Sequence, residues 1–165
     1  MSLQEGVNVY PDEMRTHTAL HVVKGAVVRV LGEGSMWTAS TYVSGKHGRL
    51  TVTCSSKPDE TQMRRVEELA NAKVMSDLRI ETVVISREDA ERMYGHVIYD
   101  LFPVPPDVKQ LTLVILYDVD GGVWNINACN KEHLPSTRFI GEIRLEKPRY
   151  RASKGLLEIP FDISP

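Results

Sequence analysis

A stretch of twenty residues, 12–31, runs without a turn signal and carries two histidines four residues apart. Asp12 is typical of a helix start, and Gly32 is typical of the position just past a helix end. Residues 22–30 are rich in β-branched side chains, which locally favour a strand. The uninterrupted length and the histidine pair nevertheless predict a helix from Asp12 to about Leu31.

The two histidines, His17 and His21, bind one metal ion only if this stretch is helical. On a helix, residues four apart share a face and their Cβ atoms lie roughly 5–6 Å apart. Zinc–nitrogen bonds of about 2.0–2.1 Å let one ion bridge such a pair. On a strand the same residues would lie roughly 13 Å apart, which is too far for one ion.

A second pair of metal-ligand residues, Cys129 and His133, has the same spacing. A thiolate and an imidazole four residues apart can meet at one ion on a helical turn or in a compact loop. Together the two pairs offer up to three nitrogens and one sulfur, which suits zinc better than Mg²⁺. We therefore predict one zinc site at His17, His21 and Cys129, with His133 as the fourth ligand.

The remaining cysteine and histidines have simpler interpretations. Cys54 follows the apolar alternation of a strand and is expected to be a small core residue. His47, in a glycine-flanked turn, and His96, after Gly95, are expected to be solvated loop residues. Two cysteines without the spacing of a disulfide framework suit a reducing cytoplasm, which is the predicted localisation.

The rest of the chain is predicted to alternate between hairpins and short helices. Expected strands cover 36–43, 49–54, 79–85, 109–117, 123–128, 139–147 and 155–163, and further expected helices cover 56–76 and 86–95. Residues 1–11 are expected to be an irregular lead-in. The three prolines of 102–106 exclude both an α-helix and a hydrogen-bonded β-strand there. This pattern predicts the α+β class, with a largely antiparallel sheet packed with a long N-terminal helix and one or two further helices.

Length and charge limit what the chain can do. The 165 residues suffice for a single domain with a full core, predicted over 1–165. No apolar run is long enough to cross a bilayer, the start lacks the pattern of a secretory signal, and no phosphate-binding Gly-Lys motif suggests ATP. The net charge of −2 creates no general basic field, so any RNA contact must come from a local patch.

Both metal motifs resemble those of the alanyl-tRNA synthetase editing domain. Residues 15–22, Arg-Thr-His-Thr-Ala-Leu-His-Val, look like its His-Thr-Ala-x-His signature, and residues 128–133 look like its Cys-x-x-x-His element. The likeness covers nearly the whole chain and is greatest to the small AlaX proteins, free-standing editing enzymes; the threonyl-tRNA synthetase editing domain is a more distant likeness. One departure is Asn130-Lys131-Glu132, where the synthetase form has Gly-Gly-Thr between cysteine and histidine.

The resemblance implies a zinc-dependent hydrolase of mischarged tRNA. The expected substrate is the ester that joins serine, or glycine, to the 3′-terminal adenosine of tRNA for alanine. Zinc could lower the pKa of a bound water toward ~7, or could hold the amino acid itself. The residues leave both this choice and the choice between serine and glycine open.

Serine differs from alanine by one hydroxyl, so the site is expected to contain a group that binds this hydroxyl. Thr38, Ser40 and Thr41 are candidates, and Thr41 is favoured as the catalytic-site residue. Strand alternation predicts that Thr38 and Ser40 share one face while Thr41 lies on the other.

Contact with tRNA is predicted at a basic segment, residues 147–154, where Arg149, Arg151 and Lys154 could neutralise phosphates and Tyr150 could stack on a base. A solvated turn is the alternative for this segment. Lys24 lies seven residues after His17 on the same helix face, where it could meet an acceptor-end phosphate or could simply be exposed.

Two other functions stay open from the sequence. A sphere of four protein ligands would suit structural zinc in a non-catalytic RNA-binding module. Structural sites, however, usually use more thiolates in closely spaced pairs, whereas Cys129 lies far from His21 in the chain. The ligands alone would also permit a zinc hydrolase that acts on a non-tRNA ester.

Overall fold

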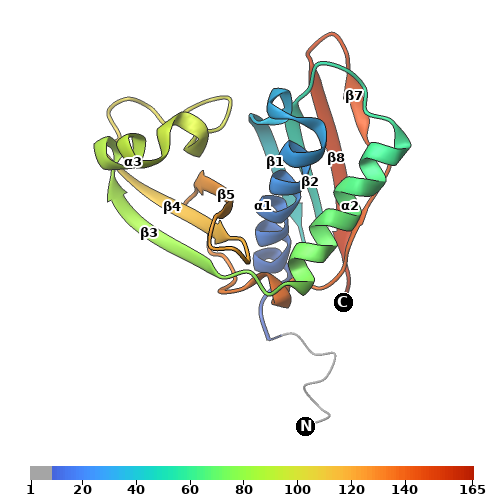
Figure 1. The fold of residues 1–165 in the computed structure, drawn as a ribbon, viewed down its shortest axis with the longest axis horizontal. Coiled ribbons are helices and arrows are strands. Elements are labelled where there is room, and N and C mark those ends of the chain that lie inside the picture. Colours follow the sequence, from blue (N-terminus) through green and yellow to red (C-terminus); the bar gives the residue numbers. More distant parts are fainter. Residues whose placement is uncertain (1–8) are drawn as a thin grey trace.

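The computed structural model describes residues 9–165, so most of the expected lead-in, residues 1–8, lies outside the described residues. Helix α1 (Asp12–Leu31) runs between two antiparallel sheets, as Figure 1 shows. The α+β class and the long helix predicted from the sequence are confirmed. No helix within residues 9–165 combines the length and apolar character needed to span a membrane.

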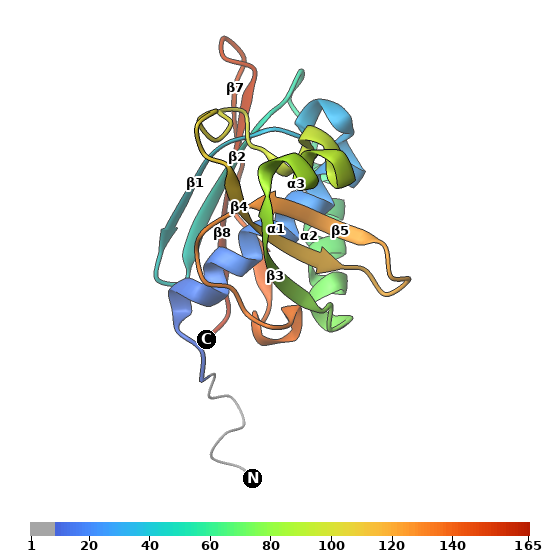
Figure 2. The same ribbon diagram turned by 90° about the vertical axis from the view of Figure 1, so that its left-hand side faces the viewer.

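One sheet has five strands and the other has three. The larger sheet has the order β1–β2–β8–β6, with β7 also paired to β8, and the smaller has the order β3–β4–β5. The strands are β1 (Thr38–Ser44), β2 (His47–Thr53), β3 (Ile80–Ser86), β4 (Gln110–Tyr117), β5 (Val123–Ala128), β6 (Ile143–Leu145), β7 (Arg149–Arg151) and β8 (Leu156–Ile163). Figure 2 views the molecule from the side of the smaller sheet, where α3 (Arg87–Tyr94) lies.

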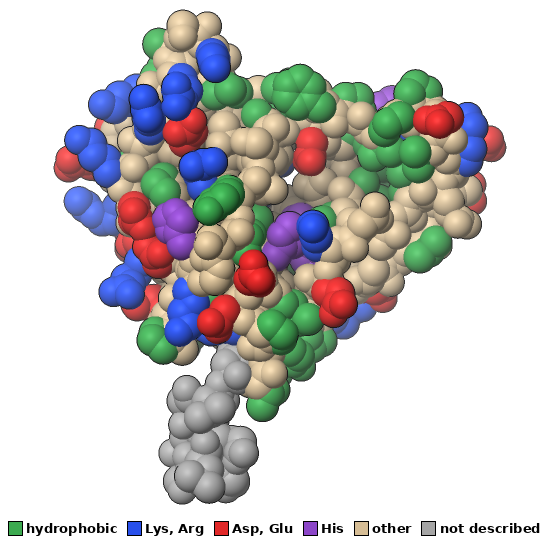
Figure 3. Space-filling view, turned by 180° about the vertical axis from the view of Figure 1, so that it is seen from behind, with side chains coloured by type: hydrophobic (Ala, Val, Ile, Leu, Met, Phe, Trp, Pro, Cys, Tyr) green, Lys and Arg blue, Asp and Glu red, His purple; other side chains and the backbone are tan. Residues whose placement is uncertain are grey.

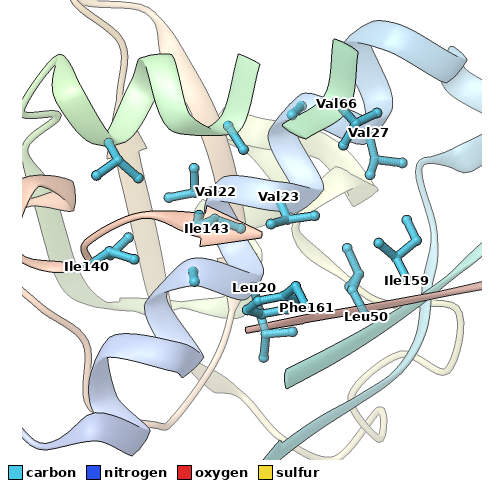
Figure 4. Packing of buried hydrophobic residues seen from close by; sticks show 14 of the residues in the cluster. Leu20, Val22, Val23, Val27, Leu50, Val66, Ile140, Ile143, Ile159 and Phe161 are labelled. Atoms are coloured by element: carbon cyan, nitrogen blue, oxygen red, sulfur yellow. The ribbon is translucent and has the colours of Figure 1, made fainter. Parts of the chain in front are cut away.

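Burial explains why a β-branched segment forms the helix α1. Val22, Val23 and Val27 are fully buried, and Figure 4 shows them among side chains from α2 (Glu60–Met75) and the larger sheet. Burying such side chains stabilises by about 1.5–3 kcal/mol each, which outweighs a helix-propensity penalty below about 1 kcal/mol. Gly25 permits a close crossing, because a Cβ there would lie 2.3 Å from Nε1 of Trp124 on β5.

The start of α2 differs in detail from the prediction. The helix begins at Glu60 rather than at residue 56, and Asp59 is its N-cap: the Asp59 carboxylate accepts from the backbone N–H of Gln62, and the Gln62 side chain accepts from the backbone N–H of Asp59. Helix α3 starts as expected from the range 86–95, with Ser86 as its N-cap: the Ser86 hydroxyl accepts from the backbone N–H of Asp89.

The strand prediction was least accurate near the C-terminus. The expected strand 139–147 is reduced to β6, because residues 137–139 form the 3₁₀ helix η4 (Thr137–Phe139). The short strand β7 was not predicted. The first hairpin turn is also tighter than expected, since β1 runs to Ser44 and β2 begins at His47. Gly45 has φ 58°, the left-handed conformation that such a short turn requires.

Candidate metal centre

Four side chains from two segments converge beside the middle of α1. His17 and His21 come from α1, and Cys129 and His133 lie in the loop that follows β5. His17 Nε2 lies 3.3 Å from Cys129 Sγ, and His21 Nε2 lies 3.0 Å from His133 Nε2. Cys129 Sγ lies 3.7 Å from His133 Nε2, and all four donor atoms lie within 4.8 Å of one another.

The three shorter distances are close to those expected around one tetrahedral ion. Zinc–nitrogen bonds of about 2.0–2.1 Å and a zinc–sulfur bond of about 2.3 Å place ligand atoms roughly 3.3–3.6 Å apart. Three imidazoles and one thiol are also donors of the right softness for zinc. The cluster could therefore bind a metal ion and is compatible with zinc. The segment Asn130-Lys131-Glu132 brings His133 to the cluster without the two glycines of the synthetase motif.

Backbone contacts fix both ends of the loop that carries Cys129 and His133. The N–H of Cys129 donates to the carbonyl of Thr112 on β4, at 2.9 Å. The N–H of Leu134 donates to the hydroxyl of Thr18 on α1, at 3.0 Å, and the Leu134 side chain is buried. Because Thr18 lies beside His17, this bond holds the loop against the same turn of helix that carries the first ligand pair.

Burial lowers the pKa values of the clustered histidines, and this favours the neutral imidazoles that bind metal ions. Desolvation lowers the pKa of His21 well below its usual value and, together with nearby His17, lowers the pKa of His133 to about 4. The imidazoles are therefore neutral donors at pH 7. Desolvation raises the pKa of the Cys129 thiol, so a bound cation is needed to favour the thiolate.

A cavity of about 60 Å³ opens beside the cluster. Its lining includes three of the four clustered residues and several polar side chains from α1, β1 and β5: His17, Leu20, His21, Lys24, Thr38, Thr41, Leu50, Asp100, Asn127, Ala128 and Cys129. Histidine side chains reach the surface in a hollow near the middle of the face in Figure 3.

Thr38 and Thr41 both line this cavity, so the prediction that they lie on opposite faces of the strand was wrong. The reason is a register shift between Thr38 and Ser40, which inserts an extra residue into β1. After this bulge, Thr41 pairs with Leu50 as Thr38 pairs with Val52, and both partners are buried. Ser40 is exposed and does not line the cavity.

Lys24 is buried at 6% exposure, so the expectation that it could simply be exposed was wrong. Its ammonium donates to the Thr38 hydroxyl at 3.1 Å, and desolvation lowers its pKa. It therefore lies in the cavity wall, one turn of α1 beyond His21.

Two cavity residues, Asp100 and Asn127, were missed in the sequence. The Asn127 amide donates to the Asp100 carboxylate at 3.1 Å, and desolvation raises the pKa of Asp100. A polar residue at a buried strand position was the available signal for Asn127, which is 7% exposed. Asp100 gave no signal, because it lies in an irregular segment before the prolines and reaches the cavity through tertiary structure.

Comparison with known proteins finds similarity over most of the chain. It is 35% identical over 148 residues to the alanine–tRNA ligase of Pyrococcus abyssi, covering 90% of this chain and 15% of the ligase. It is 36% identical over 147 residues to that of Methanopyrus kandleri, covering 89% of this chain and 15% of the ligase. With that of Thermococcus kodakarensis it shares 33% identity over 166 residues, covering 96% of this chain and 17% of the ligase.

The chain is a homologue of part of the alanine–tRNA ligases. The relation predicted from the metal motifs is confirmed, and it is consistent with an editing protein of AlaX type. The chain spans only about 15% of the length of the ligases it matches, and no family model matches it.

In this relative of the alanine–tRNA ligases, the predicted basic segment is the hairpin of β7 and β8. Arg149 and Lys154 are exposed, while Arg151 forms an ion pair with Glu158 at 2.7 Å. Tyr150 is packed against the core, and its hydroxyl donates to the carbonyl of Cys54, so it is not positioned to stack on a base as predicted. Contact of Arg149, Arg151 and Lys154 with RNA stays a prediction.

The remaining histidines and Cys54 lie outside the cluster. Cys54 is buried in the core, as predicted. His96 is largely exposed, which also agrees with the prediction. His47 differs, because it begins β2 and its Nδ1 lies 3.0 Å from the Asp162 carboxylate, so it is not simply a solvated loop residue.

Proposed function

We propose that this protein is a zinc-dependent deacylase that hydrolyses seryl-tRNA for alanine, and glycyl-tRNA as a second substrate. The observation that carries the proposal is the cluster of His17, His21, Cys129 and His133 beside a small cavity that is lined in part by polar side chains. Homology to the alanine–tRNA ligases supports tRNA as the partner. Free-standing action, in the manner of the AlaX proteins, is part of this proposal.

The size of the cavity supports a small amino acid. A water molecule needs about 10–15 Å³ of such space, so about 60 Å³ corresponds to four to six waters. This volume accommodates the aminoacyl part of a seryl or glycyl ester but leaves the ribose and the base outside. The hydroxyls of Thr38 and Thr41 line the cavity, where one of them can bind the serine hydroxyl.

Hydrolysis adds water to the ester carbonyl and breaks the bond from the carbonyl carbon to the ribose 3′ oxygen. The proton from water ends on the leaving hydroxyl, and free serine is released. The four clustered residues would hold zinc, which when bound, and with a fifth coordination position for the substrate, would supply Lewis-acid chemistry at the ester.

Charged groups on the cavity wall match the charges of the substrate. Asp100 would bind the α-ammonium group of the amino acid, since its carboxylate lines the cavity and Asn127 occupies one of its oxygens. Lys24 would stabilise the negative charge that develops on the ester oxygen, because Thr38 holds its ammonium in the cavity wall. Both groups are preoriented by hydrogen bonds, which reduces the reorganisation needed during reaction.

The proposal is tested with tRNA for alanine charged with serine, glycine or alanine, by measuring release of each amino acid with and without a metal chelator. Release of serine and glycine, sparing of alanine, and loss of activity in chelator are expected. Binding of tRNA without release would instead indicate a non-catalytic module. Release from simple serine esters but not from seryl-tRNA would indicate a hydrolase of non-tRNA esters.

A further inference from the structure

An exposed apolar segment borders the cavity. Asp100 lines the cavity, and the next two residues, Leu101 and Phe102, are 38% and 74% exposed. The backbone N–H of Leu101 donates to the carbonyl of Thr38 at 2.9 Å, which ties this segment to β1, the strand that contributes Thr38 and Thr41 to the cavity wall. In Figure 3, hydrophobic side chains border the hollow that contains the histidine surface.

The loop that presents Phe102 is held in one conformation. Prolines occupy positions 103, 105 and 106, so its backbone has few alternatives. The guanidinium of Arg87 donates to the carbonyls of Val104, Pro105 and Val108 at 3.0, 2.6 and 3.1 Å. An exposed phenylalanine on a restrained loop forms a binding surface at little cost in conformational entropy.

We propose that Phe102 is the surface on which the terminal adenine of the tRNA stacks. The inference rests on the proposed function. The cavity is small enough for the aminoacyl part of the substrate and leaves the attached adenosine outside it, and the segment that continues from Asp100 is one of its borders. An adenine ring is flat and aromatic, and stacking on an aromatic side chain is the usual way a protein holds an unpaired base.

The position of the loop fits this occupant better than a protein partner. Figures 1 and 2 both place the loop after α3 and the β7–β8 hairpin, with exposed Arg149 and Lys154, toward the upper edge of the molecule, and Figure 1 shows them on opposite sides of α1. An acceptor end that has its adenine at Phe102 and runs along this edge brings its phosphates to these exposed cations.

The test uses binding of a non-hydrolysable amide of serine with 3′-amino-3′-deoxyadenosine, measured by calorimetry, together with KM for seryl-tRNA. Phe102→Ala should weaken binding of the amide and raise KM roughly 5- to 100-fold, with kcat little changed. Phe102→Tyr should restore both, and hydrolysis of serine methyl ester, which lacks a base, should be unaffected. Met93→Ala, which alters another exposed apolar residue on α3, is the matched control.

Unchanged amide affinity and KM in Phe102→Ala, with an active wild-type protein, would overturn the inference and leave the proposed function intact. A wild-type protein that neither binds the amide nor releases serine from seryl-tRNA would overturn the proposed function itself. Sedimentation supplies a further outcome: a wild-type dimer that Phe102→Ala converts to a monomer would assign this surface to a second copy and overturn the inference.

Discussion

Thr41 and Thr38 are the two hydroxyl residues that face the cavity, and their surroundings differ. Thr38 is buried and accepts a hydrogen bond from Lys24, whereas Thr41 is more exposed. Thr41 thus has its hydroxyl available for a substrate, while Thr38 already has a partner. At the scale of single residues, we therefore propose that Thr41 provides selectivity and that Thr38 orients Lys24.

Thr41→Val keeps the size of the side chain and removes its hydrogen bond. The preference for seryl-tRNA over alanyl-tRNA should fall by about 0.5–1.5 kcal/mol, the net contribution of a hydrogen bond, because Thr41 is exposed. Comparison of kcat/KM for the two esters measures this effect, and Ser40→Ala, outside the cavity, should behave like wild type. Full selectivity in Thr41→Val would transfer the role to Thr38 or to the metal.

At the scale of elements, α1 could be predicted from the sequence because the residues at its two ends and the spacing of its two histidines all indicate a helix. Its β-branched residues gave a conflicting signal, which burial between two sheets overrides. The bulge in β1 could not be predicted, because pairing with β2 and packing on α1 determine it, and the wrong face for Thr41 followed from that omission. The short strand β7 was missed for a related reason, since it exists only through pairing with β8.

The β7–β8 hairpin carries the prediction about tRNA affinity. Replacing Arg149 and Lys154 by serine should weaken binding and flatten its dependence on salt, by about 0.7–0.9 in log–log slope per lost phosphate contact. Arg151→Ser should change the slope less, because Glu158 already neutralises that guanidinium. Filter binding of tRNA over a range of salt concentrations measures the slopes, and replacement of the exposed Arg138 by serine is the control. An unchanged slope after replacement of Arg149 and Lys154 would indicate a hairpin that is only solvated.

At the scale of the whole molecule, the candidate site forms where the two sheets meet α1. The larger sheet contributes Thr38 and Thr41, and the smaller sheet contributes Asn127 and the approach to Cys129. Sequence motifs were enough to find the four clustered residues, because spacing within each pair carries the information. Asp100 could not be found in this way, since only the packing of the two sheets brings it to the cavity.

The central claim is that this cluster binds one zinc ion and that deacylation depends on it. The most direct measurement is a zinc titration of metal-stripped protein, with seryl-tRNA hydrolysis and bound zinc followed in the same samples. Both should rise together and reach a plateau at about one zinc per chain in wild type and in Cys54→Ser, whose cysteine lies in the core. Cys129→Ser should bind zinc weakly and hydrolyse slowly; full activity in metal-free wild type, or in Cys129→Ser without zinc, would contradict the account.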